Sequence, residues 1–192
     1  VDVIAPSGAE AALHFANGDE ALPIARFDVD GAVRKTRLPA PKPLPANPVP
    51  ALGDLEKARK TVLRMEGGAM GSMRGAMMGG RMMGMRGLVG QGRVWAFNGL
   101  AEMPEKPLLS AALGETVRIE MINDTAWPHA MHLHGHHVLP LTIDDKPVAG
   151  HDWRDTVVMA ADSKMRVAFV ADNPGKWMLH CHMLEHQAAG MM

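Results

Sequence analysis

Residues 180 to 191 read His-Cys-His-Met-Leu-Glu-His-Gln-Ala-Ala-Gly-Met, and this stretch decides how the chain is interpreted. It supplies the thiolate of Cys181, an imidazole at His186 five residues later and a thioether at Met191 after five more. A second group of histidines stands at residues 129 to 134, His-Ala-Met-His-Leu-His. Two His, one Cys and a weak axial Met are the ligands of a blue-copper electron-transfer site. The sequence therefore predicts such a site, completed by one histidine of the second group.

The order of residues around Cys181 also predicts a second metal site. Side chains that follow one another along a β-strand point to opposite faces, so Cys181 must point away from both of its histidine neighbours. The same alternation separates His129 from the two histidines that follow it. We therefore assign His129, Cys181, His186 and Met191 to the blue copper, and His132, His134, His180 and His182 to a separate, outward-facing copper cluster. Cys181 with His180 and His182 then forms a covalent path for electrons between the two sites.

Zinc is the alternative metal for a set of His and Cys residues. A structural zinc site prefers four enclosing ligands with cysteines in pairs. Cys181 is the only cysteine of the chain, and the histidines beside it face the other way. We therefore expect copper, and no disulfide within the chain.

Composition and turn signals favour an all-β fold. The chain has 14 Pro, 20 Gly and only 4% aromatic residues, a composition typical of short strands joined by many turns. Seven strands separated by turns, such as the one at Asn123-Asp124, indicate a Greek-key β sandwich. The predicted strands are residues 94–97, 116–122, 130–134, 138–143, 156–159, 165–169 and 176–180.

The chain resembles the C-terminal domain of the multicopper oxidases. Residues 180 to 191 match the family's final motif, H-C-H-x-x-x-H-x-x-x-G-M, without a gap. The resemblance covers roughly residues 94 to 192 and implies a cupredoxin-like sandwich. More weakly, the first thirty residues resemble the last strands of a preceding cupredoxin domain. We expect residues 1–38 to be that tail, 39–93 a Pro-rich connector with a Met-rich loop, and 94–192 the C-terminal domain.

The resemblance also implies an enzyme, a copper-dependent oxidoreductase with dioxygen as electron acceptor. In the family, the blue copper takes electrons from a substrate one at a time, and a three-copper cluster collects four of them to reduce dioxygen to water. The family builds that cluster from eight histidines, four of them in two H-x-H pairs of the N-terminal domain. This chain has only His14 before residue 129. The isolated chain should fill the blue site but needs a missing N-terminal domain or a partner chain to complete the cluster.

Two departures from the family pattern concern the substrate and the protons. Ala126-Trp127-Pro128 precedes His129, where relatives that oxidise cuprous ion often carry Met or Asp. Gln187 follows the second blue-site histidine, where several relatives have a carboxylate that relays protons to oxygen. The first departure weakens the case for a cuprous-ion site like that of those relatives. The second means that protons must reach oxygen by a different path.

Residues 65 to 85 are rich in methionine and glycine. So high a density of Gly predicts a mobile loop without stable strand or helix. Thioether sulfur is a soft ligand that suits Cu(I), which favours copper recruitment, although Met as an adaptable apolar filler is the alternative. A Gly-rich loop offers no core for methionine to fill, which argues against this alternative. The candidate ligands are Met65, Met70, Met73, Met77, Met78, Met82, Met83 and Met85.

Cu(I) is therefore the favoured substrate, with phenols, as in a laccase-like enzyme, as the runner-up. A blue-copper electron carrier or copper-binding module without oxidase activity stays open as another class. The four outward-facing histidines argue against a simple carrier, which does not need them. Copper sequestration by the Met-rich segment is a third alternative.

The remaining histidines are expected to have lesser roles. His136 and His137 are interpreted as supporting or surface groups, His151 as part of a turn, and His14 as an ordinary strand residue. Net charge is −1 and no apolar run approaches the roughly 18 residues of a membrane span, so neither nucleic acid nor a bilayer is indicated as partner. By family analogy we expect a periplasmic or extracellular location.

Overall fold

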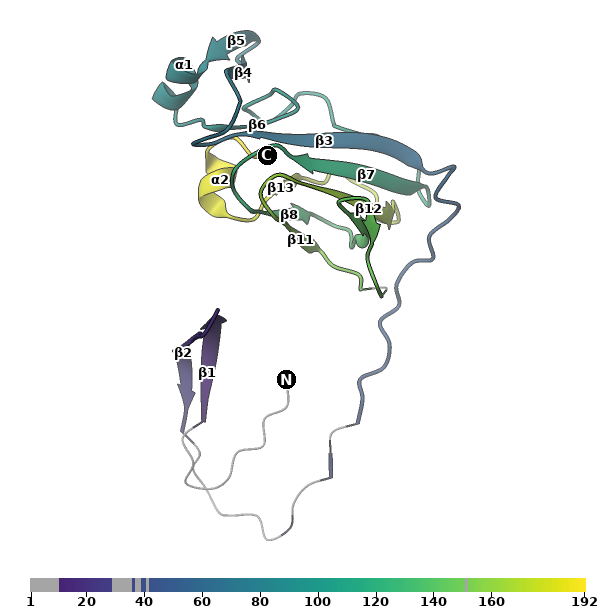
Figure 1. The fold of residues 1–192 in the computed structure, drawn as a ribbon. Helices are drawn as coiled ribbons and strands as arrows, with labels where there is room; N and C mark the ends of the chain where they lie inside the picture. Colours follow the sequence, from purple (N-terminus) through teal and green to yellow (C-terminus); the bar gives the residue numbers. More distant parts are fainter. Residues whose placement is uncertain (1–10, 29–35, 37–38, 41, 151) are drawn as a thin grey trace. The chain divides into compact units, whose positions relative to one another are not determined.

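The computed structural model describes residues 11–28, 36, 39–40, 42–150 and 152–192, and these form an almost entirely β structure (Figure 1). The all-β prediction is confirmed. The chain divides into two compact units between Asn47 and Pro48. The smaller unit contains a hairpin of β1 (Ala11–Asn17) and β2 (Glu20–Phe27). The larger unit contains β3 (Arg59–Gly67), β4 (Gly75–Met78), β5 (Arg81–Gly84), α1 (Met85–Gly90), β6 (Trp95–Phe97), β7 (Thr116–Asn123), β8 (His129–Leu133), β9 (Leu139–Ile143), β10 (Lys146–Pro147), β11 (Thr156–Met159), β12 (Ser163–Val170), β13 (Leu179–Cys181) and α2 (Leu184–Ala188).

Two sheets of the larger unit enclose one hydrophobic core. The first has six strands in the order β10-β9-β12-β7-β3-β6, and the second has three in the order β11-β8-β13. Met65 on β3, Met121 on β7, Met131 on β8 and Met159 on β11 are all buried in this core. The predicted sandwich is therefore present, with the smaller sheet carrying the histidine-rich strands on its edge and centre.

Alternating burial explains why these sequences form strands. Along β7 every second residue is buried, from Val117 to Asn123, and along β8 residues 129, 131 and 133 are buried while the residues between them are half-exposed. A period of two is what a strand with one face on a core requires. All seven predicted strands occur, with bounds that differ from the predicted ones by at most three residues.

The prediction for residues 65 to 85 is wrong. Met65 belongs to β3, which pairs in parallel with β7 and antiparallel with β6. Further along, β4 and β5 form a hairpin, and α1 follows directly. Glycines at 79 and 80 have positive φ values of 59° and 71° and make the tight turn of this hairpin. Glycine density thus marks turns between short elements here.

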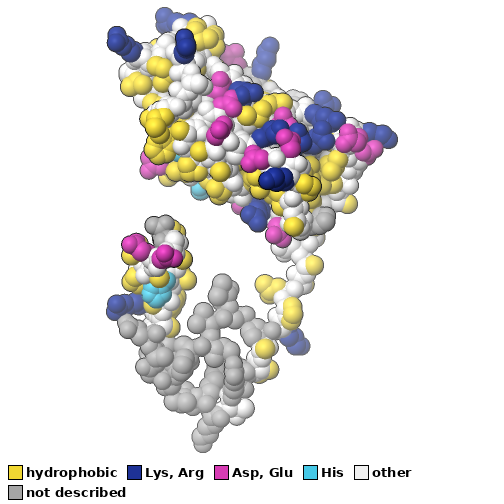
Figure 2. All heavy atoms as spheres, in the orientation of Figure 1, with side chains coloured by type: hydrophobic (Ala, Val, Ile, Leu, Met, Phe, Trp, Pro, Cys, Tyr) yellow, Lys and Arg dark blue, Asp and Glu magenta, His cyan; other side chains and the backbone are white. Residues whose placement is uncertain are grey.

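Charges of both signs are mixed on the surface of the larger unit. Figure 2 shows Lys and Arg side chains interspersed with Asp and Glu over the face in view. Pairs such as Arg166 with Glu120 (2.6 Å) contribute to this mixing. In the described residues, no helix is long and apolar enough to cross a membrane.

Candidate metal centre

The inner face of the smaller sheet brings His129, Cys181 and His186 together. His129 opens β8 and points into the core, and Cys181 ends β13, opposite Met131 of β8. The short helix α2 then turns the chain back so that His186 reaches the same point. The Cys181 Sγ lies 3.9 Å from Nδ1 of His129 and 3.8 Å from Nδ1 of His186, and the two nitrogens are 3.0 Å apart.

This donor set fits one copper ion. First-row metals bind nitrogen and sulfur at roughly 2.0–2.3 Å, so the donors of one ion stand about 3–4 Å apart. Both His129 and Cys181 have no exposed surface. Met191 is also fully buried, in the same core cluster as Cys181, and its carbonyl accepts the Cys181 N–H at 3.1 Å. Two imidazoles and a thiolate, with a buried methionine in the same core cluster, are residue types that suit blue copper.

Burial keeps the copper-free side chains neutral. It lowers the pKa of His129 to about 4, with a smaller contribution from His186. Burial likewise lowers the pKa of His186, against the opposing effect of Glu185. Burial raises the pKa of the Cys181 thiol, although the backbone N–H groups of Met183 and Ala130 oppose the rise. A metal ion that binds the thiolate must therefore displace a proton.

Trp95 of β6 forms a wall of this site that was not predicted from the sequence. Its ring centroid lies 5.0 Å from that of His129 and 4.7 Å from that of His186. The backbone N–H groups of Val94 and Trp95 both donate to the carbonyl of Ala189, at 2.9 and 3.1 Å. Gly190 has a φ of 117° and its Cα faces the Trp95 carbonyl, where a Cβ would lie 2.3 Å from the oxygen. β6 therefore fixes the loop that carries His186 and Met191.

On the outer face of the same sheet, three histidines converge. His132 on β8 stands opposite His180 on β13, and His134 follows on the same face. Ligand nitrogens of the three all lie within 4.8 Å of one another, and Nε2 of His134 is 2.9 Å from Nε2 of His180. The exposed His182 ring lies 5.4 Å from the His132 ring and 5.8 Å from the His180 ring. Three of the four residues predicted for the outward-facing group thus lie together, and the His182 ring lies next to them.

Hydrogen bonds orient two of these rings. Nδ1 of His132 lies 2.8 Å from the carbonyl of Asp155, and Nδ1 of His180 lies 2.9 Å from the carbonyl of Cys181. A carbonyl only accepts, so each Nδ1 carries the proton and each Nε2 is left with a free lone pair. Nε2 of His132 is then open to a metal ion, whereas the unprotonated Nε2 of His180 accepts a hydrogen bond from Nε2 of His134 at 2.9 Å, whose proton a bound metal ion would replace.

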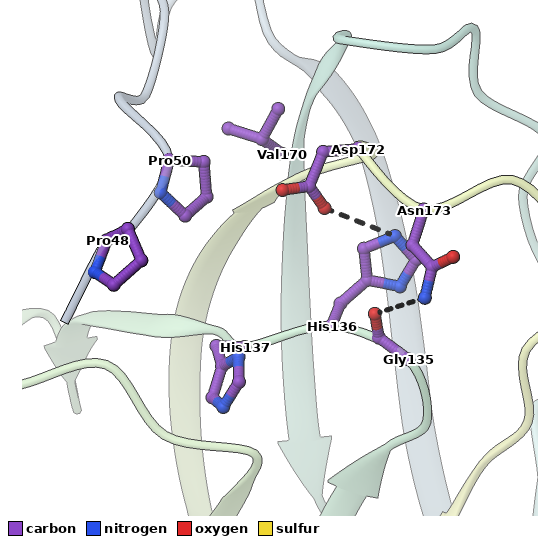
Figure 3. Close-up of a pocket in the computed structure, with 8 residues that line it drawn as sticks. All are labelled: Pro48, Pro50, Gly135, His136, His137, Val170, Asp172 and Asn173. Atoms are coloured by element: carbon purple, nitrogen blue, oxygen red, sulfur yellow. Dashed lines mark hydrogen bonds and ion pairs between the residues drawn. The ribbon is translucent and has the colours of Figure 1, made fainter.

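His136 supports this group from behind. Its ring is buried, packs 5.0 Å from the Phe169 ring, and its Nδ1 lies 3.3 Å from the His134 carbonyl. Its Nε2 faces the Asp172 carboxylate at 4.0 Å, and both residues line a cavity of about 280 Å³ (Figure 3). His137 lines the same cavity and is exposed. The supporting role predicted for His136 agrees with these contacts.

The methionines of residues 65 to 85 fall into three groups. Met65 is fully buried in the main core. Four others pack against a small second core formed by Ala76, Leu88, Ala96 and Ala101, namely Met73, Met78, Met83 and Met85. Met70 and Met82 are 84% and 69% exposed, and Met77 is half-buried. The expectation that this segment has no core to fill is therefore wrong, because its glycine turns fold it onto one.

The other predicted residues take no part in either group. His14 is an exposed residue of β1, Glu185 is exposed, and Gln187 is half-buried on α2. His151 lies outside the described residues. Trp127 is 40% exposed, and its Nε1–H donates to the carbonyl of Ala69 at 3.1 Å.

Comparison with known proteins gives consistent matches. The profile of the family described as "Multicopper oxidase" matches residues 81–192. Multicopper oxidase MmcO of Mycobacterium tuberculosis is 42% identical over 83 residues, which are 43% of this chain and 16% of that protein. A copper resistance protein A homolog of Pseudomonas syringae pv. tomato is 37% identical over 86 residues, 45% of this chain and 14% of that protein. The chain thus matches less than a fifth of the length of these relatives.

The fold is also found among solved structures. The crystal structure of Lac15 from a marine microbial metagenome superposes with a TM-score of 0.63 at 28% identity, covering 96% of this chain and 38% of that one. The predicted cupredoxin-like sandwich is confirmed by this likeness and by the sheets described above. Since the family profile spans more than half of the sequence and includes both histidine groups, the chain belongs to the multicopper oxidase family.

Proposed function

We propose that this chain is the C-terminal part of an oxidase that takes electrons one at a time at His129, Cys181, His186 and Met191. The oxidase passes them to a cluster whose first four ligands are His132, His134, His180 and His182, and there reduces dioxygen to water. The observation that carries the proposal is the arrangement of two donor groups on opposite faces of the smaller sheet. A single-site electron carrier has no use for the outer group.

Cys181 and His180 give electrons a short route between the faces. The two residues are adjacent in β13, and the ring N–H of His180 donates to the Cys181 carbonyl at 2.9 Å. One route from the sulfur to the outer imidazole therefore runs through the covalent bonds of these two neighbouring residues. A second route runs from the Cys181 carbonyl through this hydrogen bond to the His180 ring. When bound, copper supplies the one-electron redox couple at each end, and the chain supplies position and insulation from water.

The outer group needs further ligands from elsewhere. We propose that a preceding N-terminal cupredoxin domain supplies four imidazoles and that residues 1–38 are the end of a cupredoxin domain. The predicted connector at 39–93 is too long, because β3, β4, β5 and α1 belong to the unit that begins at Pro48, where β3 pairs with β7 in the larger sheet. His182 is exposed and His132 and His134 are half-exposed, while His180 is buried, so three of the four rings are accessible to further ligands, which supports the proposed N-terminal domain. A periplasmic or extracellular location remains part of this proposal.

Cu(I) is the substrate that we propose. Met70 and Met82 present thioethers at the surface. The Ala69 carbonyl, next to Met70, accepts a hydrogen bond from Trp127. Since Trp127 is two residues before His129, this bond links the Met-rich segment to the turn that leads to the blue site. Soft sulfur ligands select Cu(I). The relative named a copper resistance protein supports this choice. Met65 is left out because its side chain is buried.

The substrate can be tested on the chain itself, because reduction of the blue site does not need the cluster. The copper-loaded, oxidised chain is mixed in a stopped-flow instrument with a Cu(I) chelate or with a methoxyphenol, and loss of the blue band is followed. We expect Cu(I) to bleach the band faster than the phenol. The double variant Met70→Leu, Met82→Leu should slow bleaching by Cu(I) and leave bleaching by the phenol unchanged.

Two results would contradict the substrate assignment. Fast bleaching by the phenol with slow bleaching by Cu(I) would indicate a laccase-like enzyme. Equal rates of Cu(I) oxidation in the wild type and the double variant would show that Met70 and Met82 do not deliver Cu(I) to the site. Met103→Leu, at an exposed methionine outside the Met-rich segment, is the matched control.

A further inference from the structure

Thr125 lies in the turn between β7 and β8 and touches the copper site from behind. Only 2% of the residue is exposed, and its Oγ1 is 2.7 Å from Nε2 of His129. We propose that Asn123 and Thr125 form a hydrogen-bond relay that fixes the His129 ring, with a proton on Nε2 and a free lone pair on Nδ1. This inference rests on the proposed function, since it concerns how one ligand of the blue site is held.

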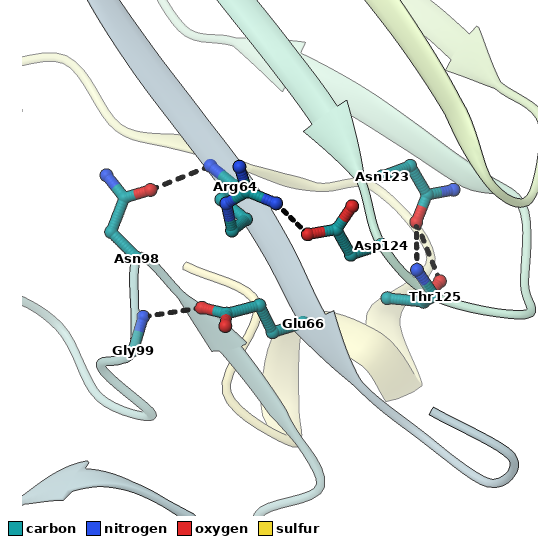
Figure 4. Close-up of polar contacts among 7 residues, drawn as sticks. All are labelled: Arg64, Glu66, Asn98, Gly99, Asn123, Asp124 and Thr125. Atoms are coloured by element: carbon teal, nitrogen blue, oxygen red, sulfur yellow. Dashed lines mark hydrogen bonds and ion pairs between the residues drawn. The ribbon is translucent and has the colours of Figure 1, made fainter. Parts of the chain in front are cut away.

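The relay begins with the orientation of the Asn123 amide. Its Nδ2 lies 2.8 Å from the Trp127 carbonyl and 2.6 Å from the Ala160 carbonyl. Carbonyls only accept, so this atom must be the NH2 group and Oδ1 must point the other way. Oδ1 then accepts from the Thr125 N–H at 3.1 Å and faces the Thr125 hydroxyl at 2.7 Å (Figure 4).

The orientation of the amide decides where the single hydroxyl proton goes. Besides His129, the Thr125 Oγ1 has two neighbours that can only accept, Asn123 Oδ1 at 2.7 Å and the Trp127 carbonyl at 3.1 Å. The hydroxyl donates to one of them, and in either case no proton is left for His129. Nε2 of His129 must therefore donate to Thr125.

A proton on Nε2 determines the state of the other ring nitrogen of His129, Nδ1. A neutral imidazole carries one proton, so a protonated Nε2 leaves Nδ1 free, and Nδ1 is the atom that lies 3.9 Å from the Cys181 sulfur. Nδ1 is thus the copper-binding atom of His129. His186, by contrast, has no hydrogen bond to its Nε2 within the part of the chain that the structure describes. The relay therefore acts on one of the two histidines.

The surrounding backbone holds the relay rigid. Asp124, between the two relay residues, pairs with Arg64 of β3 (Figure 4). The Asp124 N–H also donates to the Met65 carbonyl at 3.0 Å. The Asp162 N–H donates to the Thr125 carbonyl at 3.1 Å. The turn is thus tied to two other segments, and the hydroxyl of Thr125 is presented to His129 in one position.

Thr125→Val tests the relay, because valine keeps the shape and removes the hydroxyl. Copper affinity is measured by competition with a chelator, and the ring N–H of His129 is followed by nitrogen-15 NMR in the copper-free and the Cu(I)-loaded chain. Loss of such an outer hydrogen bond lowers metal affinity by about 10- to 100-fold. We expect that loss in Thr125→Val, together with rapid solvent exchange of a ring proton that exchanges slowly in the wild type.

Two control variants separate this role from a structural one. Thr125→Ser keeps the hydroxyl and should retain the affinity and the slow ring proton. Thr116→Val removes a hydroxyl from the other end of β7, where it accepts from the Gly53 N–H at 2.8 Å, and should leave both readouts unchanged. Unchanged copper affinity and an unchanged ring proton in Thr125→Val would overturn the relay. A lower melting temperature as the only change would do the same.

Failure of the relay and failure of the proposed function give different results. A wild-type chain that binds copper without an intense blue band would contradict the proposed function. The ring proton of the copper-free chain would still report whether Thr125 accepts from His129.

Discussion

At the scale of single residues, alternation along β13 is the feature that the sequence predicts best. Cys181 belongs to the main core, whereas the neighbouring His180, although buried, lies with His132 and His134 on the outer face of the sheet, as a strand requires. The contacts of Thr125 could not be predicted in the same way. They depend on which carbonyls surround the Asn123 amide, and those carbonyls come from distant positions such as Ala160.

Burial of His129 makes the stability of the copper-free chain depend on pH. Its pKa is lowered from 6.5 to about 4 in the folded chain, mainly by burial. Between these two values the unfolded chain binds more protons than the folded one, so the free energy of unfolding falls as pH drops. Urea denaturation of the copper-free chain should therefore show a lower midpoint near the acid end of this window than at neutral pH.

A variant isolates this contribution. His129→Gln cannot be protonated in this range and should show a shallower dependence of the urea midpoint on pH. A midpoint that does not change with pH in the wild type would contradict the account of a buried neutral imidazole.

At the scale of elements, seven strands of the sandwich were predicted from the sequence, but β3, β10, the β4–β5 hairpin and α1 were not. β7 and β8 have a period of two in burial, which their sequences show directly. Residues 65 to 85 have no such period because methionine and glycine dominate them. Their order comes from contacts with Ala96 and Ala101, outside the segment. The short helix α2 was missed for a similar reason, because its five residues are too few for a periodic pattern.

Leu88 of α1 tests whether the Met-rich segment is folded. Its side chain is fully buried in the small second core, and Leu→Ala at such a site costs about 2–5 kcal/mol. We expect Leu88→Ala to increase hydrogen exchange at the amides of β4, β5 and α1, measured by mass spectrometry, while the blue band stays unchanged.

The neighbouring residue provides the matched control. Val89 is 55% exposed, so Val89→Ala should alter exchange little. Exchange that is already fast in the wild type, and equal in all three proteins, would restore the mobile loop that the glycine content predicts.

At the scale of the whole molecule, both donor groups belong to the same unit of the chain. All eight proposed ligands lie in the unit that begins at Pro48. The motif at residues 180–191 made the family recognisable from the sequence, because it fixes residue types at short spacings. The strand order of the larger sheet, by contrast, could not be predicted. β3 joins that sheet through a parallel pairing with β7, and no local sequence pattern indicates this pairing.

The most direct test of this account is copper stoichiometry with an absorption spectrum, on the chain loaded under reducing conditions and then reoxidised. We predict one tightly bound copper per chain with an intense blue thiolate band, which Cys181→Ser abolishes and His182→Gln leaves in place. A loaded chain without the band, or a band that survives Cys181→Ser, would contradict the blue-copper site at His129, Cys181 and His186.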